Sequence, residues 1–405
     1  MFATILVWAA LAGAAGAAGD DAAWKVCKTH QGDAAITACT TLIQSQQMTT
    51  AERATALMHR GVAYGLKKRY DLAMRDMDEA IAVNPLDAVI FNERGVVYGL
   101  TDRYDLALEN FNRAIELDRT YSEPVVNRGF AYYKQKLYDR AISEYDRAIA
   151  MDLTKPQRFI NRGLAYSAKG MYDRAIEDYN LAIALKPDDA SAYACLGDVY
   201  RKKGMNDRAI ENYDRAIALS PNNANRFIAR ASTFSDKGRN DRALEDLDHA
   251  LALDPKNVTG LTNRGNAYIA KEMYTEALRD FDQAAELGSN DPTLFNDRCW
   301  ALTMLNRPEA ALADCNKSLG LRPNDPSTLD SRGFTLLRAK QFADAVRDFS
   351  AALALDPKQA SSLYGRGLAK RLSGDTAGGD ADIAAAVQLK PDIAAEFAKL
   401  GFTPH

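Results

Sequence analysis

The sequence predicts an all-α protein in which short helical hairpins of one repeated design stack into a solenoid. Two observations carry this prediction: proline recurs on a grid of 34 residues, and alanine recurs on a second grid with the same spacing. Between the grid points, apolar and small side chains return after three, four and seven residues, as in amphipathic helices. The grid positions are Pro85, Pro187, Pro221, Pro255, Pro323, Pro357 and Pro391, and Ala73, Ala107, Ala141, Ala175, Ala209, Ala243, Ala277, Ala311 and Ala345.

A third grid places small residues in the first half of each unit. Its members are Gly61, Gly95, Gly129, Gly163, Gly197, Gly265, Gly333 and Gly367, with Ala231 and Cys299 in the two gaps. Small residues in both halves let two helices approach closely, while larger Tyr, Phe and Leu side chains fill the space around the crossing. Proline near the end of a unit ends its second helix, because it lacks an N–H group.

The unit resembles the tetratricopeptide repeat. Counted from the first residue of each unit, it has Gly or Ala at position 8, mostly Tyr at 11, Ala at 20, often an aromatic residue at 24, Ala at 27 and Pro at 32. Ten consecutive units begin at Ala54, Ala88, Ser122, Pro156, Ala190, Ala224, Val258, Pro292, Pro326 and Ala360. The resemblance implies a right-handed superhelix of helix-turn-helix hairpins. It also implies a concave groove lined by positions 2, 5, 6, 9, 12 and 13 of the first helices.

Four segments are expected along the chain. Residues 1–19 carry no charged side chain and end in small residues, which is typical of a secretory signal peptide. An uncleaved anchor or a mis-set start codon is the alternative. Residues 20–53 predict a shortened N-terminal capping hairpin, residues 54–393 the ten repeats, and residues 394–405 a C-terminal capping helix and tail. Export to the periplasm or cell envelope follows from the signal peptide.

Position 7 carries arginine in nine of the ten units, and only Leu196 interrupts the column. In an antiparallel hairpin this position approaches positions 23 to 25 of the second helix, where aspartates recur. We therefore expect a ladder of arginine–carboxylate pairs.

The five cysteines suggest two disulfides, because disulfides persist in exported proteins. Cys27 and Cys39 lie symmetrically about the turn of the N-terminal hairpin, so antiparallel helices would bring them together. Cys299 and Cys315 are symmetric about the turn of the eighth unit. For this second pair the alternative is that both are ordinary small core residues.

No catalytic or cofactor chemistry is expected. The formal net charge is −3, with 51 basic and 54 acidic residues interleaved, so nucleic acid and membrane surfaces are disfavoured as partners. The four histidines form no metal-ligand motif, and there is neither a phosphate loop nor a nucleophile elbow. The sequence therefore predicts neither an enzyme nor a metal or cofactor site.

The candidate binding residues lie at the groove positions that the resemblance implies. Asparagines at position 6 resemble the ladder with which O-linked N-acetylglucosamine transferase holds peptide backbones, although they could also be repeat consensus. A polar stretch follows them, and then an exposed aromatic row, which could instead be packed under a neighbouring helix or the C-terminal cap. The residues are Asn127, Asn161 and Asn263, then Asp198, Arg201, Lys202 and Asn266, then Trp300, Phe334 and Tyr364.

Three functions are compatible with these features. The first is a non-enzymatic scaffold of the periplasm or cell envelope that binds a protein or an extended peptide in its groove. The second is a structural assembly factor or spacer that uses the edges and ends of the solenoid. The third is a cytoplasmic adaptor that regulates an enzyme complex, which requires that residues 1–19 stay attached.

Overall fold

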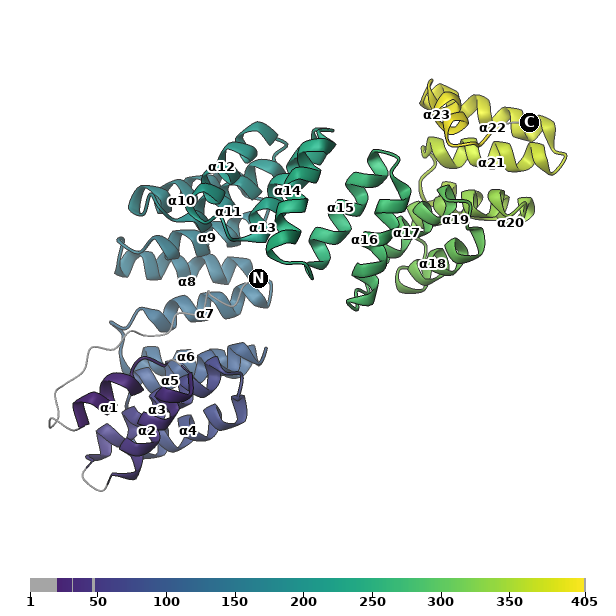
Figure 1. Ribbon diagram of the computed structural model, residues 1–405. Helices are drawn as coiled ribbons and strands as arrows, with labels where there is room; N and C mark the ends of the chain where they lie inside the picture. The colour runs from purple at the N-terminus through teal and green to yellow at the C-terminus, as the bar shows by residue number, and fades with distance from the viewer. Residues whose placement is uncertain (1–19, 31, 46–47, 404–405) are drawn as a thin grey trace. The chain divides into compact units, whose positions relative to one another are not determined.

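The computed structural model describes residues 20–30, 32–45 and 48–403, and over these residues it contains helices and no strands (Figure 1). The predicted signal peptide, residues 1–19, lies outside the described residues. A short hairpin of α1 (Asp20–Cys27) and α2 (Gly32–Gln44) precedes ten longer hairpins, and α23 (Ile393–Lys399) follows them.

Each longer hairpin has a first and a second helix. The first helices are α3 (Thr50–Leu66), α5 (Ala88–Leu100), α7 (Glu123–Lys134), α9 (Pro156–Ala168), α11 (Ala190–Lys202), α13 (Ala224–Asp236), α15 (Val258–Ala270), α17 (Pro292–Met304), α19 (Pro326–Arg338) and α21 (Ala360–Leu372). The second helices are α4 (Tyr70–Val83), α6 (Tyr104–Leu117), α8 (Tyr138–Met151), α10 (Tyr172–Leu185), α12 (Asn206–Leu219), α14 (Asn240–Leu253), α16 (Tyr274–Glu286), α18 (Pro308–Leu321), α20 (Phe342–Leu355) and α22 (Thr376–Leu389). This is the all-α solenoid of helical hairpins that the sequence predicts.

The turn inside every longer hairpin uses one residue in the left-handed backbone region, always at unit position 15. Its φ lies between 56° and 98°. A left-handed residue just after a helix ends that helix and reverses the chain, so in the hairpins that lie within one unit this residue sets the antiparallel packing. Four of the ten are glycine, which adopts this conformation without strain. The ten are Lys68, Asp102, Lys136, Gly170, Gly204, Gly238, Glu272, Asn306, Lys340 and Gly374.

The glycine grid marks where the two helices of a hairpin touch. A Cβ atom on Gly265 would lie 2.3 Å from the ring of Phe281, and one on Gly163 would lie 2.6 Å from the ring of Tyr179. Real Cβ atoms do not approach so closely, so a glycine at position 8 makes room for the large residue at position 24. Phe281 and Tyr179 are almost fully buried as a result.

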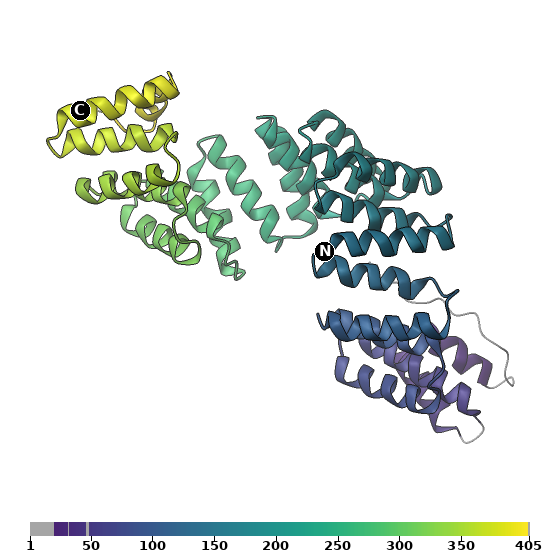
Figure 2. The ribbon, with the colours of Figure 1, turned by 180° about the vertical axis from the view of Figure 1, so that it is seen from behind.

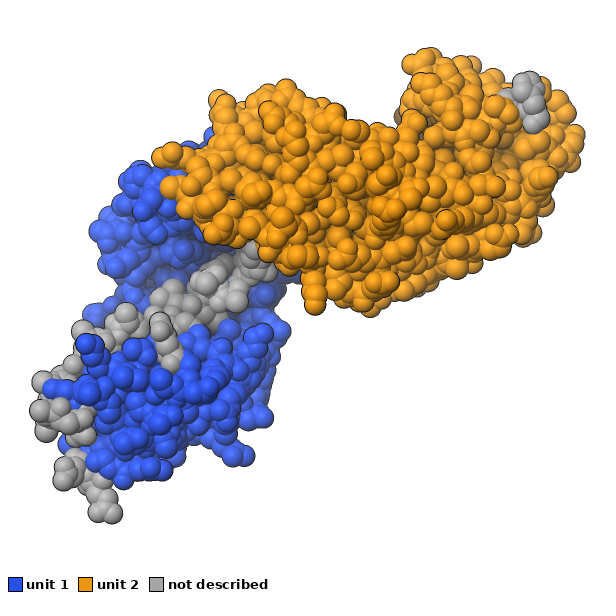
Figure 3. Space-filling model, in the orientation of Figure 1, with its two compact units in different colours: residues 1–203 blue, residues 204–405 orange. Residues whose placement is uncertain are grey.

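The chain divides into two compact units, residues 1–203 (unit 1) and residues 204–405 (unit 2) (Figure 3). Within each unit the hairpins stack in chain order, as Figures 1 and 2 show from opposite sides. Successive first helices contact one another, for example α3 with α5 and α17 with α19, whereas no such contact joins successive second helices over the described residues. The first helices therefore form the inner side of the stack in each unit.

Candidate partner-binding face

The arginine column at position 7 forms the predicted ladder. Arg162 is typical: its Nε and Nη2 atoms donate to the two carboxylate oxygens of Asp178 in the same hairpin, at 2.9 and 2.6 Å. Asp178 is only 2% exposed. The same bidentate arrangement joins Arg60 to Asp76, Arg230 to Asp246, Arg264 to Asp280, Arg298 to Asp314, Arg332 to Asp348 and Arg366 to Asp382. These arginines and aspartates hold the hairpins together.

Four of these arginines also reach a carboxylate of the preceding hairpin, which the sequence did not predict; they are Arg162, Arg230, Arg264 and Arg298. Nη1 of Arg162 lies 2.6 Å from a carboxylate oxygen of Asp146, and Nη1 of Arg264 lies 2.8 Å from one of Asp248. Asp146 and Asp248 are more than half exposed, so these second contacts are the weaker ones. The guanidinium group therefore joins two consecutive hairpins as well as the two helices of one.

We call the surface formed by positions 2, 5, 6, 9, 12 and 13 of the first helices the inner face. It holds every binding residue predicted from the sequence. Its chemistry changes along the stack: position 9 is Val62 in the first hairpin, Asp198 in the fifth, Asn266 in the seventh and Trp300 in the eighth.

The prediction that Asn127 binds a peptide as part of an asparagine ladder is wrong, because a peptide cannot reach its amide. Asn127 is fully buried, and its amide donates to Oδ1 of the neighbouring Asn92 at 3.0 Å. Asn161 is also buried, and its Oδ1 accepts a hydrogen bond from Gln157 at 2.9 Å. Its Nδ2 is buried and has no hydrogen-bond partner among the residues that the structure describes. In unit 2 the amide of Asn263 donates to the Ser232 hydroxyl at 3.0 Å.

The polar stretch of unit 1 reaches the surface. Asp198 and Lys202 are exposed at the end of α11, and Arg201 is half-buried beside them. Nζ of Lys202 lies 3.3 Å from the Ser167 hydroxyl of the preceding first helix. These side chains give the inner face of unit 1 groups of both charges.

The inner face of unit 2 carries two carboxylates that sequence reasoning missed, Asp297 and Asp330. The exposed Asn266 and the adjacent Asn296 donate hydrogen bonds to Asp297. The Ser362 hydroxyl donates to Asp330 at 2.5 Å. Over the described residues neither carboxylate has a cationic partner, unlike the aspartates of the arginine ladder. Burial raises the pKa of Asp297 and of Asp330 to about 6.

The predicted exposed aromatic row is wrong for Phe334 and Tyr364, which are 0% and 1% exposed. The chain's own C-terminal segment covers them: the Phe397 ring of α23 stacks on Phe334 at 4.6 Å and on Tyr364 at 5.4 Å between ring centroids. Trp300 stays partly exposed and meets the edge of Phe334 at 5.9 Å. Packing under the C-terminal helix, the alternative interpretation of this row, is what the structure contains.

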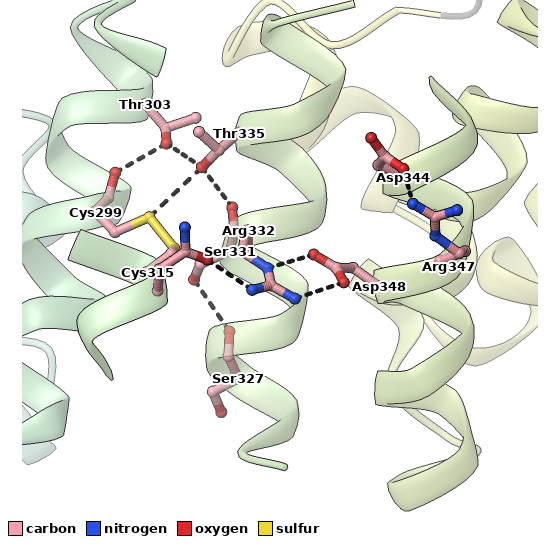
Figure 4. A network of polar contacts seen from close by, with 11 residues as sticks. Cys299, Thr303, Cys315, Ser327, Ser331, Arg332, Thr335, Asp344, Arg347 and Asp348 are labelled. Atoms are coloured by element: carbon pink, nitrogen blue, oxygen red, sulfur yellow. Dashed lines mark hydrogen bonds and ion pairs between the residues drawn. A yellow bond between two sulfur atoms is a disulfide. The ribbon is translucent and has the colours of Figure 1, made fainter. Parts of the chain in front are cut away.

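Both predicted cysteine pairs are joined, Cys27 to Cys39 with sulfurs 2.05 Å apart and Cys299 to Cys315 with sulfurs 2.04 Å apart. Figure 4 shows the second disulfide, which links α17 to α18. A buried pair of hydroxyls beside it, Thr303 and Thr335, shares a hydrogen bond of 2.6 Å between α17 and α19. Together these contacts fix three helices next to the aromatic part of the inner face.

The described residues meet the requirements of neither a metal site nor a membrane span. They contain no group of three or more His, Cys, Asp or Glu side chains placed to hold a metal ion. None of their helices combines the length and the apolar character that crossing a membrane requires.

Family models described as TPR repeat or tetratricopeptide repeat match almost the whole repeat region. The matches cover residues 54–85, 88–121, 123–155, 163–204, 197–234, 231–272, 263–326 and 333–392. The chain belongs to the tetratricopeptide-repeat family. No curated protein matches this tetratricopeptide-repeat chain in sequence.

Solved structures similar to this tetratricopeptide-repeat protein include other repeat proteins. A chain of the Cut9–Hcn1 hetero-tetramer of the APC/C is 14% identical with a TM-score of 0.55. The match covers 87% of this protein and 85% of the chain in that structure. A tetratricopeptide repeat protein from Parabacteroides merdae is 16% identical with a TM-score of 0.50, covering 62% and 98%. These two likenesses concern the fold alone. YrrB, described as a TPR protein with an unusual peptide-binding site, is 28% identical with a TM-score of 0.38, covering 47% and 98%.

Proposed function

We propose that this protein is a non-enzymatic scaffold that binds a partner protein or an extended peptide with its inner face, in the periplasm or cell envelope. One observation carries the proposal. The arginine ladder pairs the buried aspartates of the second helices, whereas Asp297 and Asp330 on the inner face have no cationic partner over the described residues. Both carboxylates are half-buried, and a carboxylate that is partly withdrawn from water without a counter-charge is costly. A cationic group of a partner would offset that cost.

The surroundings of these carboxylates suit a binding surface. Asn266 is exposed and already donates to Asp297, and an amide can both donate to and accept from a peptide backbone. Trp300, partly exposed at the same unit position one hairpin later, adds an aromatic side chain of the kind that anchors interfaces. A segment with a Lys or Arg side chain next to an apolar one would satisfy both features.

The experiment is affinity capture from cell-envelope extracts with the full chain and two double variants. Asn266→Ala with Asp297→Asn alters the inner face, whereas Arg242→Ala with Glu245→Ala alters α14, where both side chains are about two-thirds exposed. We expect the first pair to lower recovery of the same identified partner at least ~10-fold and the second pair to leave it unchanged. Equal recovery with both pairs would refute the inner face as the binding site and would favour the edges or ends of the solenoid.

Location is a separate part of the proposal, supported by the uncharged residues 1–19 and by the two disulfides. The mass of the mature protein tests it: a chain that begins near Asp20 with four cysteines oxidised is expected. A full-length chain with five reduced thiols would instead favour a cytoplasmic adaptor.

A further inference from the structure

The C-terminal segment, residues 393–403, packs on the inner face of unit 2. Its helix α23 contacts α21 and α22, and Figure 1 shows it beside them. Two aromatic side chains five residues apart make the main contacts. Phe397 stacks on Phe334 and Tyr364, and the ring of Phe402 lies 4.9 Å from that of Phe334. The segment thus covers positions that the inner face uses elsewhere in the stack.

Arg338, the last residue of α19, recognises the backbone of this segment. Its Nη2 atom donates to the carbonyl oxygen of Leu400 at 2.5 Å, and its guanidinium lies 4.5 Å from the centre of the Phe402 ring. A cation at the carboxyl end of a helix is favourable, because the last carbonyl groups there lack partners within the helix. Arg338 forms no ion pair over the described residues, and its Nε is buried without a hydrogen-bond partner. The hydrogen bonds found for this arginine therefore go to the segment alone.

The segment covers this part of the inner face without filling it. A hollow of about 300 Å³ remains beside Phe402, lined by Leu337, Phe342, Leu368 and Leu372 among others. The helix α23 has only seven residues, too few to be stable in water without its contacts. A short helix that holds Phe397, with Phe402 just beyond its end and an unfilled hollow beside it, is a segment that a better-fitting one could replace.

We propose that the surface formed by Trp300, Phe334, Arg338 and Tyr364 is a docking site for a short helical segment of a partner protein. That segment carries one aromatic side chain in its helix and a second one five residues later, just beyond the end of the helix, and residues 393–403 occupy the site as an intramolecular mimic until it displaces them. This inference rests on the proposed function and names one part of the inner face with the partner chemistry it takes. The contacts of Phe397, Phe402 and the Leu400 carbonyl supply the pattern that the partner reproduces.

An internal occupant lowers the apparent affinity for any competing segment. Only residues 390–392 join α22 to α23, so the C-terminal segment is held at high local concentration. The apparent dissociation constant for a competitor is the intrinsic one divided by the fraction of molecules in which the site is open. Weakening the internal contacts must then tighten binding of the competitor.

The probe is a fluorescein-labelled synthetic peptide of residues 391–405, added to the full-length chain and followed by anisotropy. We expect the Phe397→Ala/Phe402→Ala variant of the chain to bind the peptide at least ~10-fold more tightly than the unchanged chain does. A peptide with both phenylalanines changed to alanine should bind neither. Lys399→Ala, an exposed change on the same helix, should behave as the unchanged chain.

Three results would overturn the proposal. The first is no peptide binding by a Phe397→Ala/Phe402→Ala chain whose circular dichroism is unchanged, which would make α23 a permanent cap. The second applies if that variant loses helical signal, in which case Arg338→Met replaces it in the test. If the Arg338→Met chain binds the peptide no better than the unchanged chain does, the segment is not displaceable. The third is a concentration-dependent dimer of the unchanged chain that the phenylalanine changes abolish, which would make a second copy the occupant. None of these results depends on the capture experiment, so the two proposals can fail independently.

Discussion

Replacing Arg162 with methionine should destabilise unit 1 strongly, because it leaves a buried carboxylate unpaired. Asp178 is 2% exposed and receives two hydrogen bonds from Arg162, whereas Asp146 receives one and its side chain is 52% exposed. Breaking a buried ion pair from one side costs about 3–5 kcal/mol. Since the Arg162 side chain is itself 19% exposed, we expect a loss near the lower end, about 3 kcal/mol. Asp146→Asn should cost under about 1 kcal/mol.

The pH dependence follows from the same contacts. Burial raises the pKa of Asp178 above its ordinary value, and Arg162 opposes that rise. Without the arginine the pKa of Asp178 rises further, so the folded state holds a proton that the unfolded state has released. A raised carboxyl pKa begins to cost stability when the pH passes the ordinary value of 3.8, and the cost is complete once the pH exceeds the raised pKa. The loss of unfolding free energy caused by Arg162→Met should therefore be largest at neutral pH and should shrink as the pH falls toward 4.

Native-state hydrogen exchange of the amides of α9 and α10 is the suitable assay, because long repeat arrays do not unfold in two states. A loss of about 3 kcal/mol corresponds to exchange roughly 100-fold faster. Arg113→Met is the control and should change exchange little, because this exposed arginine makes its ion pair with the exposed Glu116 and otherwise lies over the Phe91 ring at 6.0 Å. Arg162→Met with Asp178→Leu should recover most of the loss. If the double variant is no more stable than the single one, or if Arg113→Met costs as much, the reasoning about the ladder is wrong.

Three further predictions concern unit 2. Gly265→Ala should destabilise it by about 1–3 kcal/mol, because its Cβ would lie 2.3 Å from an aromatic ring, whereas Gly320→Ala meets nothing within 4 Å and should be neutral or stabilising in a urea titration. Since burial raises the pKa of Asp330 from 3.8 to about 6, this carboxyl should lower stability by about 2 kcal/mol as the pH rises from 4 to 7. Asp330→Asn should remove that share of the slope and leave the similar share of Asp297. Replacing Cys299 and Cys315 with alanine should cost about 3 kcal/mol, read from native-state hydrogen exchange of the amides of α17 and α18, and unchanged exchange would contradict the cross-link.

The parts of the fold that repeat could be predicted from the sequence, because a period of 34 residues fixes which residues face each other inside a hairpin. This is why the pairing of Arg162 with Asp178 and the joining of Cys299 to Cys315 followed from symmetry about a turn. The second acceptor, Asp146, did not follow from it. That contact depends on how one hairpin stacks on the next, and the spacing within a hairpin does not set this.

The binding face was harder to predict, because its residues depend on neighbours that break the period. Asn127 was expected to hold a peptide, but Asn92, a residue of the preceding hairpin, takes its hydrogen bond. Phe334 was expected at the surface, but Phe397 from the far end of the sequence covers it. A clue to Asp330 was present: it is an acidic side chain on a first helix, away from the arginine column.

The contact of arginines such as Arg162 with two hairpins bears on how such an array can grow. An additional hairpin of the same design would bring one arginine, one carboxylate that pairs with that arginine, and one carboxylate that pairs with the arginine of the following hairpin. Gene duplication in steps of 34 residues therefore keeps the charges of the ladder balanced, whereas inserting half a hairpin would leave an aspartate such as Asp178 buried beside no arginine. Electrostatics, as well as packing, restricts changes in the length of this protein to whole repeats.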